Sequence, residues 1–372
     1  MKNWGMWIFA WIFSSCASSN LSHSQLDRIP AQQDVHQKKL QVSNHKWRFV
    51  IIPDTQIYTK NDDNLNVLAE SVNWIIANKQ KYNIEAVFHV GDIVDNNTPE
   101  QWQRAAQVLS KLRGKVRFYI TTGNHDFGID GLGKTRDTLF QNYFPMKSLS
   151  SIDGLQNVFS KSEGLLNATY DFQVGAESFR VLTLEFGPRD EVLNWALNES
   201  NAADEKKMIL VIHEYMDMVS AFKSKDGRPT PSHKNTYGNA HHYVLSDTSK
   251  NNGQEIWQKL IFPSPNFEWV FSGHYDDVVS LTRFRRKPVL RQGHAFTYRG
   301  DTQSNGNIVH QTMFDAQWID NGGDGWLQFV EFDSRRKGAA RIFTYSPWLS
   351  EMGNLAKGEA QEPIDFEIRR KE

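Results

Sequence analysis

The stretch FVIIPDTQIYTK, residues 49–60, runs from an apolar segment directly into a carboxylate. Phe49 to Ile52 have the apolar, β-branched character of a buried strand, and Pro53 and Asp54 end it. Asp54 could start a turn or cap a helix. It could also serve chemistry, because ligands of α/β sheets bind at the carboxyl ends of strands. Other strand ends in the chain have to decide between these interpretations.

Strand patterns and helical spacing alternate along the chain. In the first third we expect strands at 47–52, 85–90 and 116–121 and helices at 65–76 and 99–112. This alternation predicts βαβ units and a largely parallel sheet, and therefore an α/β fold. Further on we expect a hairpin around Gly175, helices at 189–200 and 253–261, strands at 207–213 and 267–273, and mostly strands over 277–345 with a tight turn at NGGDGW. The irregular stretch 214–250 is long for a loop and is expected to be functional.

Four further strand patterns end, like the first, on side chains that can bind metal. They are followed by Gly91-Asp92, by Gly123-Asn124-His125-Asp126, by His213, and by Gly273-His274 with Asp276. Asp, Asn and His are common turn residues, so a single case indicates little. Five cases in chain order indicate a metal site at one edge of the sheet system.

These motifs resemble those of the calcineurin-like metallophosphoesterase superfamily over residues 47–290. The PDTQ sequence at 53–56 is similar to a secreted branch with Gln in its first motif, and the segment that includes NGGDGW extends this likeness to about residue 347. The resemblance implies a four-layer αββα sandwich around two divalent metal ions. It also implies that water activated by the ions attacks the phosphorus of a phosphate ester in line.

The resemblance assigns a role to each matching residue. Asp92 would bridge two ions, Asp54 would bind the first, and Asn124, His213 and His274 would complete the second site. His125 would be a general acid or a donor to phosphate, a role that typically contributes 10²–10⁴-fold to the rate. Asp126 would orient the His125 ring, as carboxylates commonly do for catalytic imidazoles.

Two positions depart from the family pattern at the first metal site. Gln56 and Asp276 stand where the family usually has histidines. The first site would then contain only oxygen donors, from Asp54, Gln56, Asp92 and Asp276, which favours Mn²⁺, Mg²⁺ or Ca²⁺, whereas the second site suits Zn²⁺, Mn²⁺ or iron. We expect the first site to be the weaker one. In the alternative interpretation, Gln56 and Asp276 merely hydrogen-bond around a single-metal centre.

The N-terminus has the layout of an export signal. Lys2 precedes a short apolar run, and FSSC, ending at Cys16, resembles a bacterial lipobox. We expect a signal peptide over 1–16, an acylated Cys16, a polar tether over 17–46, a metallophosphoesterase domain over 47–350 and a polar tail over 351–372. The expected location is the periplasm or the cell surface, with the lipid as membrane anchor. The alternative is an ordinary signal peptide cleaved after Ala17.

Composition limits the classes of partner. The 42 basic and 43 acidic side chains give a net charge of −1, so a dominant basic surface for nucleic acid is not expected. We expect an exported phosphoesterase acting on a phosphomonoester or phosphodiester. The alternative from another class is a non-catalytic surface-binding lipoprotein with one structural metal ion. Weaker site candidates are His241, His242, His294, His310, Arg136 and Arg189.

Overall fold

A computed structural model describes most of the chain from residue 40 onward. The described residues are 40, 42–129, 131, 133–203, 205–217, 237–243, 245, 249–275, 295–336, 339–352 and 365–369. Among them, no helix combines the length and the apolarity that crossing a bilayer requires. The predicted signal peptide, Cys16, His294 and Asp276 lie outside the described residues.

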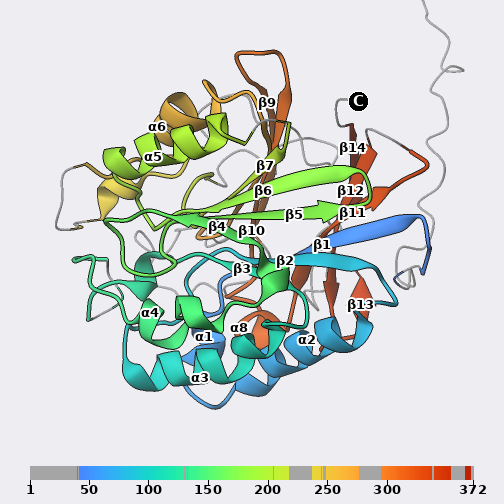
Figure 1. The fold of residues 1–372 in the computed structure, drawn as a ribbon. Coiled ribbons are helices and arrows are strands. Elements are labelled where there is room, and N and C mark those ends of the chain that lie inside the picture. Colours follow the sequence, from blue (N-terminus) through green and yellow to red (C-terminus); the bar gives the residue numbers. More distant parts are fainter. Residues whose placement is uncertain are drawn as a thin grey trace, which may run out of the picture. The chain divides into compact units, whose positions relative to one another are not determined.

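Two seven-stranded sheets form the centre of the fold (Figure 1). In the first sheet, β1, β2 and β3 are parallel, and β11 and β12 continue it in antiparallel pairing. Its strands are β1 (Lys46–Ile52), β2 (Ile84–His89), β3 (Arg117–Ile120), β11 (Leu327–Asp333), β12 (Ala339–Ser346), β13 (Glu351–Met352) and β14 (Asp365–Arg369). The predicted parallel βαβ arrangement is thus confirmed for β1 to β3.

The second sheet is also parallel at its centre and antiparallel at its edges, in the order β4-β5-β6-β7-β8-β10-β9. Its strands are β4 (Leu155–Val158), β5 (Ala168–Val174), β6 (Glu177–Thr183), β7 (Lys207–Val211), β8 (Phe267–Ser272), β9 (Ala295–Thr302) and β10 (Ile308–Asp315). The hairpin expected around Gly175 joins β5 and β6. Gly175 has φ +59°, a conformation that favours glycine.

Helices cover the outer face of each sheet (Figure 1). The α-helices are α1 (Gln56–Thr59), α2 (Leu65–Asn78), α3 (Pro99–Leu109), α4 (Phe140–Tyr143), α5 (Asp190–Asn201), α6 (Gly253–Ile256) and α8 (Asp320–Gly323). A π-helical turn, η7 (Trp257–Ile261), continues α6, and short 3-10 turns lie at 110–112, 124–126, 146–148, 151–153 and 240–242. Local sequence explains where two of these helices begin. Pro99 is the first residue of α3, and Asn252 and Glu255 form a reciprocal capping box at the N-terminus of α6.

The core lies between and around the two sheets. Phe49 of β1 packs edge-on against Phe172 and Phe179 of the facing sheet, with ring centroids 6.0 and 5.5 Å apart. A second cluster under α5 and η7 buries residues such as Leu193, Leu210 and Leu260. Helix, sheet, sheet and helix therefore form the expected α/β sandwich.

Two segments behave differently from the predictions. Residues within the predicted polar tail form β13 and β14, which both pair with β12, so this part extends the first sheet. The NGGDGW segment is more than a tight turn: Asn321 through Gly325 all have positive φ. Its glycines lie against α1, where the Gly325 N–H donates to the Tyr58 hydroxyl at 2.9 Å.

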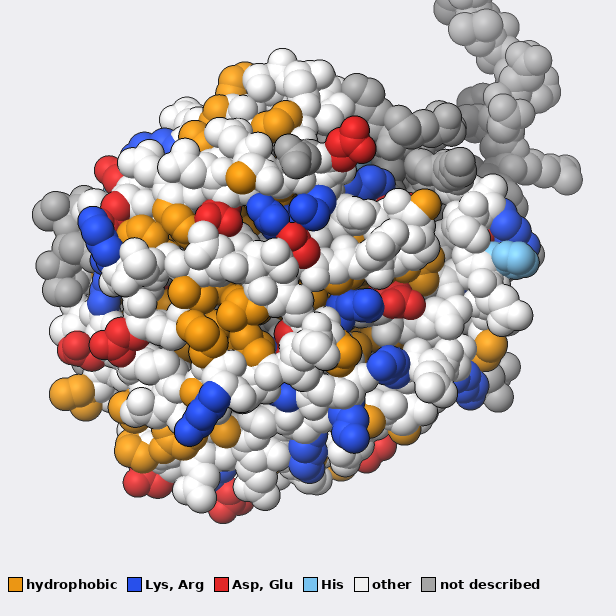
Figure 2. All heavy atoms as spheres, viewed as in Figure 1, with side chains coloured by type: hydrophobic (Ala, Val, Ile, Leu, Met, Phe, Trp, Pro, Cys, Tyr) orange, Lys and Arg blue, Asp and Glu red, His pale blue; other side chains and the backbone are white. Residues whose placement is uncertain are grey.

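Basic and acidic side chains are interspersed on the face shown in Figure 2. Neither sign forms a continuous patch there, as the near-balanced composition suggests.

Candidate metal centre

The strand ends singled out in the sequence converge in the fold. Asp54 follows β1, Asp92 follows β2, Asn124 follows β3, and His213 and His274 follow β7 and β8. Parallel strands end at one edge of each sheet, and the backbone links the two edges: the His274 N–H donates to Asp54 Oδ2 at 3.0 Å.

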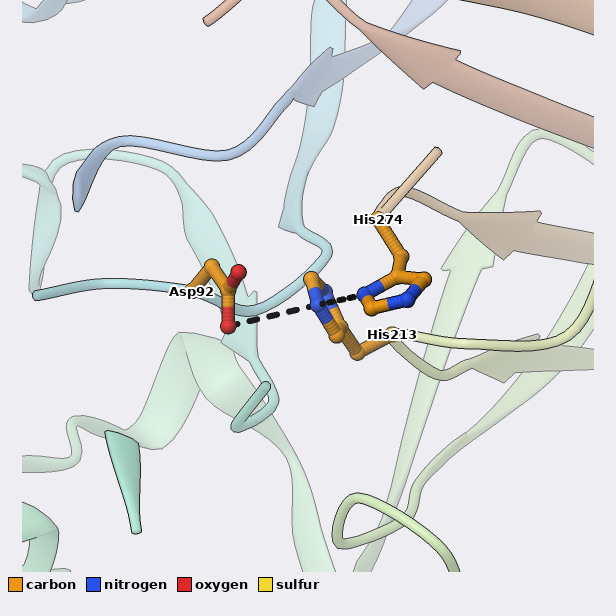
Figure 3. A group of neighbouring side chains, drawn as sticks. All are labelled: Asp92, His213 and His274. Atoms are coloured by element: carbon orange, nitrogen blue, oxygen red, sulfur yellow. Dashed lines mark hydrogen bonds and ion pairs between the residues drawn. The ribbon is translucent and has the colours of Figure 1, made fainter. Parts of the chain in front are cut away.

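Three candidate ligand atoms surround a fourth, His213 Nε2. Asp92 Oδ1 and Asn124 Oδ1 each lie 3.2 Å from it, and His274 Nδ1 lies 3.0 Å from it. Figure 3 shows Asp92, His213 and His274 turned toward one another. His213 Nδ1 donates to the Val90 carbonyl at 3.0 Å, which leaves the Nε2 lone pair as a ligand. Ligands bound to one ion at about 2.1 Å lie roughly 3.0–3.4 Å apart, so the four donors fit a divalent metal.

Backbone shape brings these ligands together. Gly123 lies so close to Asp92 that a Cβ on Gly123 would be 2.1 Å from Asp92 Oδ1, and a Cβ on Gly273 would be 2.1 Å from Asp54 Oδ1. Asp92 and His274 adopt positive φ values of +49° and +83°. Such strain persists where surrounding contacts fix the conformation, and it is frequent at functional sites.

The pKa values of the side chains in the centre favour binding of a cation. Burial opposes the charged form of Asp92, but His213 and His125 outweigh burial and hold its pKa well below the usual range. Burial alone would lower the pKa of His213, yet Asp92 and Asp54 raise it to about 10. Burial and the neighbouring His213 lower the pKa of His274 to about 3. Without metal the cluster therefore keeps a proton on His213, which a metal ion would displace.

The first-site residues lie beside this cluster. The Gln56 amide Nε2 donates to Asp92 Oδ2 at 3.0 Å, while its buried Oε1 has no hydrogen-bond partner in the described part of the chain. Burial, and then the charge of Asp315, raise the pKa of Asp54 well above its usual range. Buried carboxylates and an unpaired amide oxygen suit a hard cation.

The backbone of His125 contacts Asp92, and Asp126 does not orient the His125 ring. The His125 ring donates from Nδ1 to the Asp95 carbonyl at 2.8 Å, and the backbone N–H of His125 donates to Asp92 Oδ1 at 2.9 Å. The buried Asp126 carboxylate instead accepts the backbone N–H groups of Ile93, Val94 and Gly123. The predicted role of Asp126 is corrected: it holds two loops together, and a backbone carbonyl orients the imidazole.

Sequence reasoning missed three residues next to the centre. Asp315 ends β10 beside β8 and is 1% exposed. Only two apolar residues, Met313 and Phe314, directly precede it, so its signal is weaker than the one that revealed Asp54. Glu214 directly follows His213, and Tyr243 comes from the irregular insert. The Tyr243 hydroxyl lies 3.3 Å from His274 Nε2. No local pattern marks a tyrosine in such an insert.

The weaker candidates have structural partners instead. His241 pairs with Glu255 at 2.7 Å, and His242 contacts Asn239. His310 is buried against Trp269 and bonded to Tyr298. Arg136 and Arg189 both pair with Glu185.

Comparison with known proteins agrees with this geometry. The profile of the calcineurin-like phosphoesterase family matches residues 47–275, and the chain belongs to that family. An uncharacterized Bacillus subtilis protein, YvnB, is 24% identical over 329 residues, which cover 87% of this chain but only 21% of YvnB. The chain thus spans about a fifth of that relative's length. The structure of GAP50, described as the anchor in the inner membrane complex of Plasmodium, aligns with 88% of this chain and 90% of its own at 11% identity and a TM-score of 0.42.

Proposed function

We propose that this protein is an exported, metal-dependent phosphoesterase that hydrolyses a phosphomonoester or a phosphodiester. The observation that carries the proposal is that donor atoms of Asp92, Asn124 and His274 all lie within 3.2 Å of His213 Nε2. The backbone N–H of His125 contacts the same Asp92 carboxylate. Bound ions of this kind polarise the phosphoryl group and lower the pKa of water. The residues themselves bind and orient the phosphate and supply a proton.

His125 is suited to donate that proton. Burial lowers its pKa, but Asp92 and the Asp95 carbonyl outweigh burial and raise the pKa above the ordinary value of 6.5. These contacts therefore favour the protonated form of His125 over that of a free imidazole. With Nδ1 held by Asp95, the other ring nitrogen, Nε2, is the one to serve a leaving oxygen.

We propose two ions of different character. Asn124, His213 and His274 with Asp92 supply nitrogen and oxygen, which suits Zn²⁺, Mn²⁺ or iron. Asp54, Gln56 and Asp92 supply oxygen alone, which suits Mn²⁺, Mg²⁺ or Ca²⁺. The altered first site is also the observation that favours the alternative, a non-catalytic binding protein with one structural ion.

Metal analysis combined with hydrolysis assays separates the two functions. We expect purified protein to hydrolyse p-nitrophenyl phosphate or bis-p-nitrophenyl phosphate, to lose activity in chelator, and to regain it with Mn²⁺ or Zn²⁺. Asp92→Ala should lose metal and activity together, whereas His242→Ala, at an exposed histidine outside the centre, should keep both. Bound metal without turnover of either ester class would favour the binding protein.

Export and lipid anchoring are part of the proposal and rest on Cys16 after the short apolar run. Cys16→Ala should move the protein from the membrane to the soluble exported fraction. Wild-type protein that is already soluble after signal removal would contradict the anchor.

A further inference from the structure

The carboxylate of Glu214 is buried beside the metal centre and is only partly satisfied. Its residue is 2% exposed, Oε1 accepts the Tyr275 hydroxyl at 2.7 Å, and Oε2 has no hydrogen-bond partner within the described residues. A buried polar atom without a partner is costly, so such a group needs an explanation.

The His274 ring lies within ion-pair distance of this carboxylate. Its Nδ1 faces the other ligands, 3.0 Å from His213 Nε2, and its Nε2 lies 3.3 Å from the Tyr243 hydroxyl and 3.8 Å from Glu214 Oε1. A histidine that binds metal through Nδ1 carries its proton on Nε2, and that N–H needs an acceptor. Within the described residues, Glu214 is the carboxylate on this side of the ring.

Backbone geometry makes such support necessary. His274 holds φ +83°, a costly conformation for a residue with a Cβ, so its ring position depends on what surrounds it. Glu214 is itself fixed by contacts: a Cβ on Gly238 would lie 2.7 Å from Glu214 Cγ, and Tyr275, which holds Oε1, accepts the Asn239 N–H at 3.2 Å.

We propose that Glu214 is a positioning residue of the metal centre: its carboxylate, together with the Tyr243 hydroxyl, faces the proton-bearing Nε2 side of the His274 ring and so keeps Nδ1 toward the ion. The inference rests on metal binding at this centre, which the proposed function shares, and is independent of turnover. It also links residues 237–243, the returning end of the irregular insert, to a metal ligand.

Metal affinity tests the proposal without an activity assay. Zn²⁺ and Mn²⁺ dissociation constants of the full-length protein are measured by competition with a chromophoric chelator. Glu214→Ala should weaken the tighter ion by about 10- to 100-fold, which is typical for loss of a group that orients a ligand. Glu214→Gln should recover much of that affinity, because its amide oxygen can still accept from Nε2.

Two further variants distinguish positioning from a purely structural role. Tyr275→Phe removes the hydroxyl bound to Oε1 but keeps the carboxylate, so its metal affinity should stay near wild type. In a His274→Ala background, Glu214→Ala should weaken binding no further. Unchanged affinity in Glu214→Ala, or an equal loss with and without His274, would overturn the proposal, whether or not the protein hydrolyses any ester. Urea unfolding of each metal-free variant shows whether it is folded. If Glu214→Ala does not fold, the metal affinities of Glu214→Gln and Tyr275→Phe are compared instead, and a loss in both that is as large as that expected for Glu214→Ala would overturn the proposal.

Discussion

His125 is the residue on which the proposed chemistry depends most directly. Its Nδ1 is committed to the Asp95 carbonyl, and it is not among the side chains that converge on His213. His125→Ala should therefore lower turnover by roughly 10²-fold or more while metal content stays near wild type. Steady-state kinetics with metal analysis of the same sample checks this, and His242→Ala is the matched histidine control. Equal turnover in His125→Ala and wild type would exclude the general-acid role.

Gly123 tests the close packing of the centre at the same scale. Its φ of −106° is open to any residue, so alanine there adds only a methyl group 2.1 Å from Asp92 Oδ1. Gly123→Ala should displace that carboxylate and reduce turnover by about 10²-fold, since a shift of about 1 Å has that effect. Gly300→Ala in β9, whose nearest neighbour would be at 3.3 Å, should be nearly silent in the same assay.

At the scale of elements, a buried ion pair joins β1 to β11. Arg48 and Glu331 face each other in the ladder, and Glu331 also binds Lys46 at 2.6 Å. The Arg48 side chain is completely buried, so Glu331→Gln leaves an uncompensated charge and should cost about 3–5 kcal/mol of unfolding free energy. Urea unfolding of wild type and variant at the same metal concentration measures this loss of unfolding free energy.

Glu85 provides the control for that measurement. Glu85 pairs with Arg117, but both side chains are about one-third exposed, at 31% and 27%. Water and salt screen such a pair, so Glu85→Gln should cost less than about 1 kcal/mol. Similar losses in the two variants would mean that burial of the Arg48–Glu331 pair has no special weight.

At the scale of the whole molecule, stability and metal binding are linked through protons. In the metal-free protein Asp92 and Asp54 raise the pKa of His213 to about 10, above its unfolded value, so its stabilising proton is present at low pH and is lost as pH rises toward 10. Burial also raises the pKa of Asp126 and of Glu214 to about 7, so the stability that their protons contribute is likewise lost as pH rises toward 7. From pH 7 to 8.5 the chelator-treated protein should lose on the order of 2 kcal/mol.

Bound metal should remove most of this pH dependence. The ion replaces the proton on His213, so urea midpoints of the metal-loaded protein should change much less over the same range. The comparison needs only unfolding curves at pH 7 and 8.5, with and without a stoichiometric ion. Parallel pH dependence in both forms would contradict the assigned ligand role of His213.

Much of this architecture and site could be predicted from local signals in the sequence. Apolar runs that stop at Asp54, Asp92, His213 and His274 mark both a strand and the edge where it ends. This is possible because hydrophobic periodicity is a local property of the sequence. Helical spacing and a proline at the first helical position likewise located α2 and α3. These strand ends supply the residues that the family resemblance assigns to the nitrogen-containing site.

Only the tertiary structure decided the contacts made between distant segments. Asp126 stands next to His125 in the chain, yet its carboxylate binds the backbone of Ile93 and Val94, and the Asp95 carbonyl orients the imidazole. Asp315 became a neighbour of the centre through the pairing of β10 with β8, and β14 joined β12 from a polar stretch. Sequence adjacency fixes which side chains are available, whereas hydrogen-bond partners depend on backbone groups that folding brings within about 3 Å.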